Sequence, residues 1–205
     1  MGKLWDVLLY PVRFYGRLTD KKAALFAGII FVGIIDLFSP DYIKTYINLF
    51  TGKPLMNVQY NVLLAVALIF LIGFADVIFF SAPLFDIFKF FKKKEGLPEG
   101  LSVFKIMKVY IMSHFLIIPV TTFLYYAVFQ YINEKSSVLM LNLYVAQFFI
   151  ILIWSSAIVS RGINALFAFN PIFRRLIFIM VFTWNFILGM VFDLQIINML
   201  MKLFK

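Results

Sequence analysis

Long apolar stretches, separated by short polar and basic segments, dominate the pattern of residues along this chain. The clearest stretch covers residues 61–82 and contains one acidic residue, Asp76. A helix needs about 20 apolar residues to cross a bilayer, so this stretch alone predicts one membrane span, which we expect to end at Pro83. The apolar runs are continuous rather than alternating, which favours helices over the strands of a β-barrel.

Four other stretches have a similar character, at residues 23–38, 103–131, 138–160 and 172–200. We therefore predict an all-α polytopic membrane protein whose five transmembrane helices form one domain over residues 23–205. Residues 1–22 combine helically spaced apolar residues with basic ones, which predicts an amphipathic segment in the cytoplasmic headgroup layer. Residues 84–94 and 163–169 fit short interfacial amphipathic helices, although their pattern also allows them to continue the preceding spans.

The composition supports an integral membrane protein. The chain of 205 residues is 63% hydrophobic with a mean hydropathy of +0.97, whereas soluble domains are about 45–50% apolar. The net charge of +9 would suggest nucleic acid as a partner of a soluble protein. In a membrane protein, basic residues instead set the topology and attract anionic lipid headgroups. We therefore expect membrane lipids as partners and no nucleic-acid binding.

The basic residues are distributed unevenly between the two sides that five spans would define. Fourteen of the 19 Lys and Arg residues fall on one side, and the asymmetry alternates from loop to loop. Basic loops remain cytoplasmic, so we predict a cytoplasmic N-terminus and a C-terminus outside. The residues that we expect at the cytoplasmic membrane surface are Arg13, Arg17, Lys89, Lys92, Lys93, Lys94, Arg174 and Arg175.

The segment before the first span is Leu9-Tyr10-Pro11-Val12-Arg13-Phe14-Tyr15, a proline followed by aromatic residues. Together with five spans and a cytoplasmic N-terminus, it resembles the Yip-domain family of small integral membrane proteins over residues 5–200. The resemblance implies a prokaryotic-type member in the cell membrane, with no catalytic residues. The chain lacks the long N-terminal region and the Asp-Leu-Tyr-Gly-Pro signature of the eukaryotic members, so Rab binding is not implied.

Motifs for catalysis or cofactor binding are missing from the sequence. There is one histidine, no cysteine, no H-E-x-x-H motif and no Walker loop. The acidic residues of the apolar stretches, Asp36, Asp76 and Asp193, are scattered through the chain, as is Asp86. We therefore predict a protein that is not an enzyme, with no catalytic residues, no metal site and no cofactor.

Five polar residues within or at the ends of the expected spans are candidates for a functional site: Asp76, His114, Gln147, Arg161 and Asn185. Residue counting places His114, Gln147 and Asn185 near mid-membrane, Asp76 and Arg161 towards the cytoplasmic side, and Asp36 towards the outer side. Ionisable residues inside a span are costly and usually face a protein interior or a wet cavity. For Asp76 we predict that it faces the bundle and pairs with Arg161, directly or through water, which stabilises helix packing; the alternative is a proton or ligand site.

Two classes of function are consistent with these features. The first is a membrane organiser that acts without catalysis, through a second copy of the chain, another protein or lipids at its basic, aromatic cytoplasmic face. The alternative is a small transporter, channel or lipid-handling protein that uses the polar residues inside the bundle.

Overall fold

The structure is a computed structural model that describes residues 2–37, 54–94, 102–124, 137–167 and 169–191. Every element that it describes is an α-helix, which confirms the all-α prediction. In chain order the helices are α1 Gly2–Leu9, α2 Val12–Tyr15, α3 Lys22–Leu37, α5 Leu55–Lys94, α6 Val103–Leu124, α7 Ser137–Phe167 and α8 Pro171–Val191.

Four of these helices contain stretches long and apolar enough to cross a membrane, namely Met56–Lys93, Val103–Leu124, Leu141–Phe167 and Pro171–Val191. An integral membrane protein is therefore confirmed, with four candidate spans among the described residues. The first expected span corresponds to α3, whose 16 residues are fewer than the roughly 20 needed for a perpendicular crossing. The expected ends of the third and fifth spans, at 125–131 and 192–200, lie outside the described residues.

Two helices are longer than expected because they continue through predicted boundaries. Helix α5 has 40 residues, passes through Pro83 and includes residues 84–94. Helix α7 includes residues 163–167. Residues 84–94 and 163–167 therefore belong to long helices and do not form separate interfacial helices. Proline lacks the N–H that would bond to the carbonyl four residues earlier, here that of Phe79. The indole Nε1 of Trp184 in α8 donates to this Phe79 oxygen at 3.2 Å, which replaces the missing bond and allows the helix to continue.

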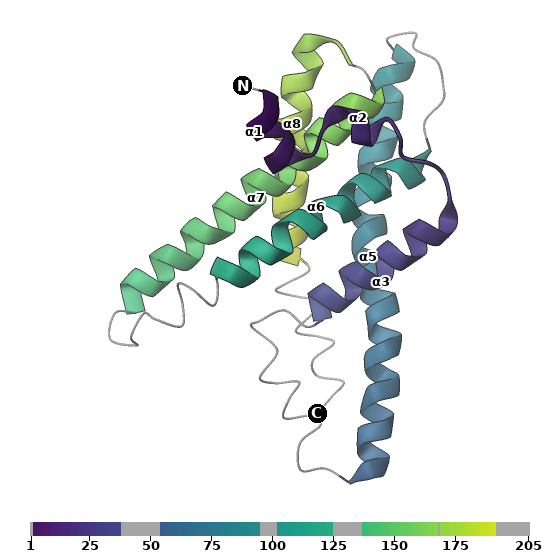
Figure 1. The fold of residues 1–205 in the computed structure, drawn as a ribbon, viewed down its shortest axis with the longest axis vertical. Coiled ribbons are helices and arrows are strands. Elements are labelled where there is room, and N and C mark those ends of the chain that lie inside the picture. The colour runs from purple at the N-terminus through teal and green to yellow at the C-terminus, as the bar shows by residue number, and fades with distance from the viewer. Residues whose placement is uncertain (1, 38–53, 95–101, 125–136, 168, 192–205) are drawn as a thin grey trace.

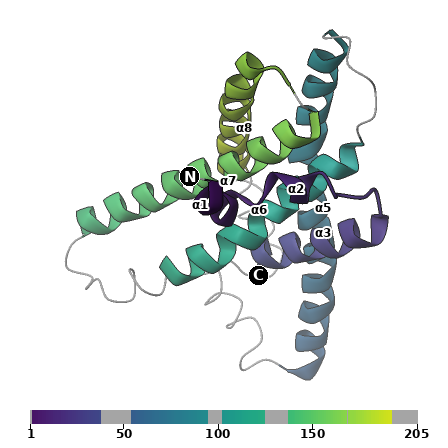
Figure 2. The ribbon, with the colours of Figure 1, turned by 45° about the horizontal axis from the view of Figure 1, so that its top comes forward.

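Helix α5 crosses the other helices as the longest element of the fold (Figure 1). Helices α6 and α7 run side by side and obliquely to it in both views (Figures 1 and 2). Helix α3 packs against α5 and α6, and α8 packs against α7 and α5. At about 1.5 Å per residue, α5 is about 60 Å long, twice the thickness of the hydrocarbon core.

The contact between α3 and α5 depends on two glycines. An ideal Cβ at Gly33 would lie 1.9 Å from the Ile69 carbonyl oxygen, and one at Gly73 would lie 2.2 Å from that of Ile29. No side chain fits there, because the backbones of the two helices touch, as is common where small residues line membrane helix contacts. The glycines therefore fix where α3 crosses α5.

The N-terminal segment is joined to α6 and α7 by hydrogen bonds from side chains to backbone carbonyls. Tyr15 is fully buried, and its hydroxyl donates to the carbonyls of Leu9 at 2.8 Å and Ile158 at 3.2 Å. Burial raises the pKa of the Tyr15 phenol, although nearby Arg161 opposes this shift, so the hydroxyl stays protonated as a donor. Buried Lys108 of α6 donates from Nζ to the carbonyls of Thr19 and Lys21. These bonds join the segment to the body of the protein.

The lysine-rich end of α5 packs against the end of α7 and the connection to α8. Buried Phe88 of α5 packs against Phe167 at the end of α7 and Phe169, with ring centroids 5.8 and 6.0 Å apart. Asn170 then caps α8, because its Oδ1 accepts from the backbone N–H groups of Ile172 at 3.0 Å and Phe173 at 3.1 Å. The connection from α7 to α8 is thus anchored on the lysine-rich end of α5.

Candidate functional site

The candidate site is centred on Asp76 of α5, which is 6% exposed. The hydroxyl of Tyr110 in α6 donates to its carboxylate, with distances of 3.0 Å to Oδ1 and 2.9 Å to Oδ2. The Tyr110 ring stacks on Phe80, one turn beyond Asp76, with centroids 3.8 Å apart. The carboxylate of Asp76 is therefore held in one orientation by a ring that cannot turn freely.

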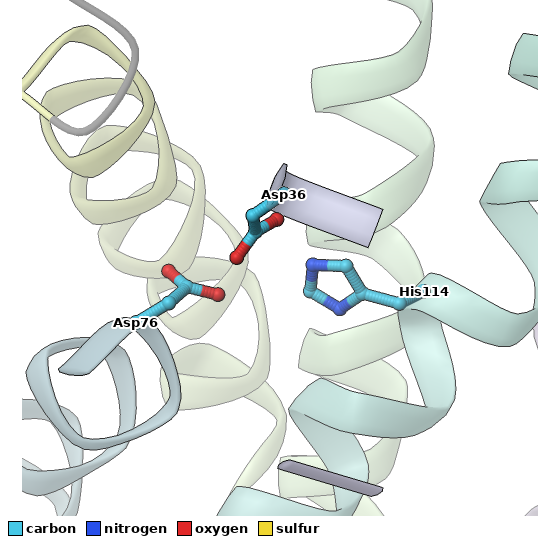
Figure 3. Close-up of side chains that lie close together, drawn as sticks. All are labelled: Asp36, Asp76 and His114. Atoms are coloured by element: carbon cyan, nitrogen blue, oxygen red, sulfur yellow. The ribbon is translucent and has the colours of Figure 1, made fainter. Parts of the chain in front are cut away.

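His114 follows Tyr110 by one helical turn and joins the same site. Its Nδ1 lies 3.1 Å from the Tyr110 carbonyl oxygen, which can only accept, so Nδ1 carries the proton. In the neutral ring Nε2 then has a free lone pair. Figure 3 shows this second nitrogen turned towards the two aspartates. The imidazole is thus oriented as an acceptor or metal ligand.

Asp36 of α3 completes a cluster of three side chains from three helices (Figure 3). One potential ligand atom each from Asp36, Asp76 and His114 lie within 4.8 Å of one another. Each aspartate follows a crossing glycine by three residues, in Gly33-Ile34-Ile35-Asp36 and Gly73-Phe74-Ala75-Asp76. The close glycine contact places both acids beside the helix crossing.

This juxtaposition corrects the expected depths of Asp36 and Asp76, which residue counting placed towards opposite sides of the membrane. Counting assumes that both helices run along the membrane normal, whereas α3 crosses α5 obliquely in Figures 1 and 2. The acids are scattered along the sequence, and Asp36 was not among the predicted site residues. The repeated Gly-x-x-Asp pattern was the signal that could have found it.

Helix α6 is held against α3 near the cluster. Phe31 and Phe115 stack face to face with centroids 3.9 Å apart. One turn earlier in each helix, Ile111 fills the space above Gly28, where an added Cβ would lie 2.7 Å from its Cγ2. These contacts fix the distance between the helix that carries His114 and the helix that carries Asp36.

Arg161 has an ion-pair partner that the sequence did not predict. It forms an ion pair with Asp6 of α1, whereas Asp76 accepts from Tyr110. The direct pair of Asp76 with Arg161 does not occur among the ion pairs of the described side chains. The reason is that α1 packs on α7 and brings the Asp6 carboxylate to Arg161. Helix α1 belongs to the N-terminal segment, which we expected to lie in the headgroup layer and not against the spans.

The other two candidate polar residues lie elsewhere. Asn185 of α8 donates from Nδ2 to the hydroxyls of Ser155 at 3.2 Å and Ser156 at 3.5 Å, both in α7. This is a hydrogen bond between packed helices. Gln147 is half-buried on α7, two turns before Ser155. The predicted polar residues therefore do not share one site. Asp76 and His114 lie in one cluster, and Asn185 lies in a contact between α7 and α8.

The predicted surface basic residues are mostly exposed, namely Arg13, Arg17, Lys89, Lys93, Arg174 and Arg175. Two lysines lie over aromatic rings, Lys89 at 5.9 Å from the Phe85 centroid and Lys92 at 5.6 Å from that of Phe167. Arg174 donates from Nε to the Phe169 carbonyl at 2.9 Å. These contacts hold the aliphatic stems against the fold and leave positive charge at its surface.

An apolar groove of about 900 Å³ lies between α3 and α5. Leu25, Phe26, Ile29, Phe70 and Phe74 are among its lining residues, and Asp76, His114, Gln147 and Asn185 are not. The groove is therefore separate from the polar cluster.

Comparison with known protein families, with curated proteins and with solved structures finds no match to this chain. The Yip-domain resemblance has no support from these comparisons and stays a prediction.

Proposed function

We propose that this protein is a small membrane transporter or channel that handles a cation at the cluster of Asp36, Asp76 and His114. The observation that carries the proposal is the convergence of two carboxylates and an imidazole from three helices. Two carboxylates this close repel each other, and the repulsion is strong where water is scarce. A cation between them removes it, so the arrangement favours binding of positive charge.

Placement in the fold supports a functional role for this cluster. Asp76 and His114 lie on helices α5 and α6, both of which contain candidate membrane spans. Ionisable groups at such positions are uncommon in membrane proteins and usually mark ion or substrate pathways. A purely structural role would be served by one neutral hydrogen bond, as between Asn185 and Ser155.

We propose no catalytic activity for this protein. In a nucleophilic enzyme the free histidine nitrogen faces the hydroxyl or thiol that it activates. Here the Nδ1 of His114 donates to a backbone carbonyl, and the other nitrogen faces carboxylates (Figure 3). This geometry suits ligand binding rather than proton abstraction from a nucleophile.

The test is cation flux into proteoliposomes made with the full chain. One set of vesicles contains pyranine, which reports protons, and another contains calcein, whose fluorescence Mn²⁺ quenches. We expect flux above that of protein-free vesicles, reduced at least about 10-fold by Asp76→Asn. The matched control is Asp86→Asn, which removes an exposed carboxylate from the same helix and should leave flux unchanged. Flux equal to that of protein-free vesicles in both sets would reject the transport function.

A second candidate function is that of a lipid- or partner-binding organiser, favoured by the basic, aromatic end of the fold. Arg13 and Arg17 are exposed on the N-terminal segment, which Tyr15 and Lys108 anchor to the body. Fixed arginines at a membrane surface attract anionic headgroups. Native mass spectrometry should show retained anionic lipid that Arg13→Gln with Arg17→Gln removes, or a homo-oligomer. A lipid-free monomer would reject this candidate.

We further propose five spans in a prokaryotic cell membrane, with α3 as the first span, the N-terminus in the cytoplasm and the C-terminus outside. The support is the alternating distribution of basic residues. Single cysteines introduced at Ser136 and Gly96 into this cysteine-free chain should react from opposite faces of intact cells. Position 136 should react from outside and position 96 only after permeabilisation; labelling of both from one face would contradict the topology.

A further inference from the structure

We infer that Asp36, Asp76 and His114 bind one divalent transition-metal cation of the Mn²⁺, Fe²⁺ or Zn²⁺ class. This inference deepens the proposed function and rests on it, since it names the ion that the cluster handles. The ligands are one carboxylate oxygen from each aspartate and Nε2 of the histidine. They come from α3, α5 and α6, so a bound ion would join three helices.

The spacing of the ligand atoms suits a shared ion. Bonds from Zn²⁺ to histidine nitrogen or carboxylate oxygen are about 2.0–2.2 Å, which puts neighbouring ligand atoms about 3.3 Å apart in a tetrahedral site. The three side chains place their atoms within 4.8 Å of one another, so shifts of about 1.5 Å at most would bring them to the spacing of a tetrahedral site. Three protein ligands leave at least one coordination position open for water or a second anion.

Tyr110 orients two of the three ligands. Its hydroxyl bonds to both oxygens of Asp76, and its carbonyl accepts from Nδ1 of His114. Histidines that bind metals commonly donate their other ring N–H to a carbonyl or carboxylate, which fixes the ring and its tautomer. We therefore assign Tyr110 as a positioning residue for the metal site.

Charge and ligand type define the class of ion. Two carboxylates and a neutral imidazole offer two negative charges to a bound ion, which suits a divalent cation. An imidazole ligand favours transition metals over Mg²⁺ and Ca²⁺, which prefer oxygen. The chain has no cysteine, so the thiolates that select Cu⁺ are missing.

The experiment measures metal binding by the purified full chain in detergent, with a tag that contains no histidine. Titration calorimetry with Zn²⁺ should give one site per chain, with Mg²⁺ at the same concentration failing to compete. Asp36→Asn, Asp76→Asn and His114→Gln should each weaken Zn²⁺ binding at least about 10-fold, and the control Asp86→Asn should not. Tyr110→Phe keeps the ring on Phe80 and should weaken binding about 10–100-fold without changing the stoichiometry.

A spectroscopic measurement on the unmodified protein keeps the test independent of variants that fail to fold. Electron spin echo modulation of bound Mn²⁺ should show the nitrogen coupling of an imidazole, and the chain has only one histidine. Absence of saturable Zn²⁺ binding, or binding unchanged in all three ligand variants, would overturn the inference.

The two proposals fail separately. One-to-one Zn²⁺ binding in detergent without flux in proteoliposomes would support the metal site and reject transport. Proton flux that depends on Asp76, without Zn²⁺ binding, would support the transport function and reject the metal site.

Discussion

Replacement of Gly33 by alanine tests whether the backbone contact between α3 and α5 builds the cluster. The added Cβ would lie 1.9 Å from the Ile69 carbonyl oxygen, whereas real Cβ atoms essentially never approach a heavy atom within 3.0 Å. The two helices must therefore move apart by at least about 1.1 Å at the crossing. Because Asp36 and Asp76 lie three residues beyond the crossing glycines, the carboxylates should separate as well.

The expected energy follows from two opposing effects. Overpacking of a tight contact costs about 1–3 kcal/mol, and the upper value applies here because the obstacle is backbone, which cannot rotate away. Alanine is better than glycine inside a helix by about 1 kcal/mol. The net loss in free energy of unfolding should be about 2 kcal/mol for Gly33→Ala. The matched control is Gly189→Ala in α8, where the added Cβ meets nothing within 4 Å, so this variant should gain up to about 1 kcal/mol.

The assay is reversible unfolding in mixed detergent micelles, followed by Zn²⁺ titration of the folded protein. Gly33→Ala should be the less stable variant by about 3 kcal/mol relative to Gly189→Ala, and it should bind Zn²⁺ at least about 10-fold more weakly than the unmodified protein. Equal stability of the two variants would show that α3 and α5 do not touch at Gly33. Loss of stability with unchanged Zn²⁺ affinity would show that the crossing does not position the carboxylates.

The remaining predictions concern hydrogen bonds and ion pairs outside the cluster. Trp184→Phe should lower the free energy of unfolding by about 1–3 kcal/mol, because the Phe79 carbonyl loses its donor. In a Pro83→Ala background, which restores a backbone N–H, the same change should cost much less. Changes in the free energy of unfolding that add within about 0.5 kcal/mol would contradict this coupling. Asp6→Asn and Arg161→Gln should couple in the same assay, by up to about 1 kcal/mol for a pair that is partly exposed. Asp76→Asn and Arg161→Gln should be additive, and coupling between these two would restore the pair predicted from sequence.

The N-terminal segment shows why the partner of Arg161 could not be found from the sequence. Its Trp, Tyr and basic residues predict an amphipathic segment, and such a pattern is equally compatible with a free interfacial helix. The choice depends on carbonyl acceptors and side-chain donors far apart in the chain, such as Tyr15 with Ile158. Hydropathy contains no information on such pairs.

The sequence by itself determined that this is a helical membrane protein, because a backbone in lipid must satisfy its own hydrogen bonds within each apolar stretch. It also indicated Asp76 and His114 as candidates. Only the tertiary structure decided that Pro83 stays inside a helix, since the donor that replaces its N–H is Trp184, far along the chain. Only the tertiary structure brought Asp36 to Asp76, because the crossing of α3 and α5 depends on a backbone contact between two glycines. Distances along one helix follow from its residue count, whereas distances between helices follow from the side chains and backbones that pack at their contacts.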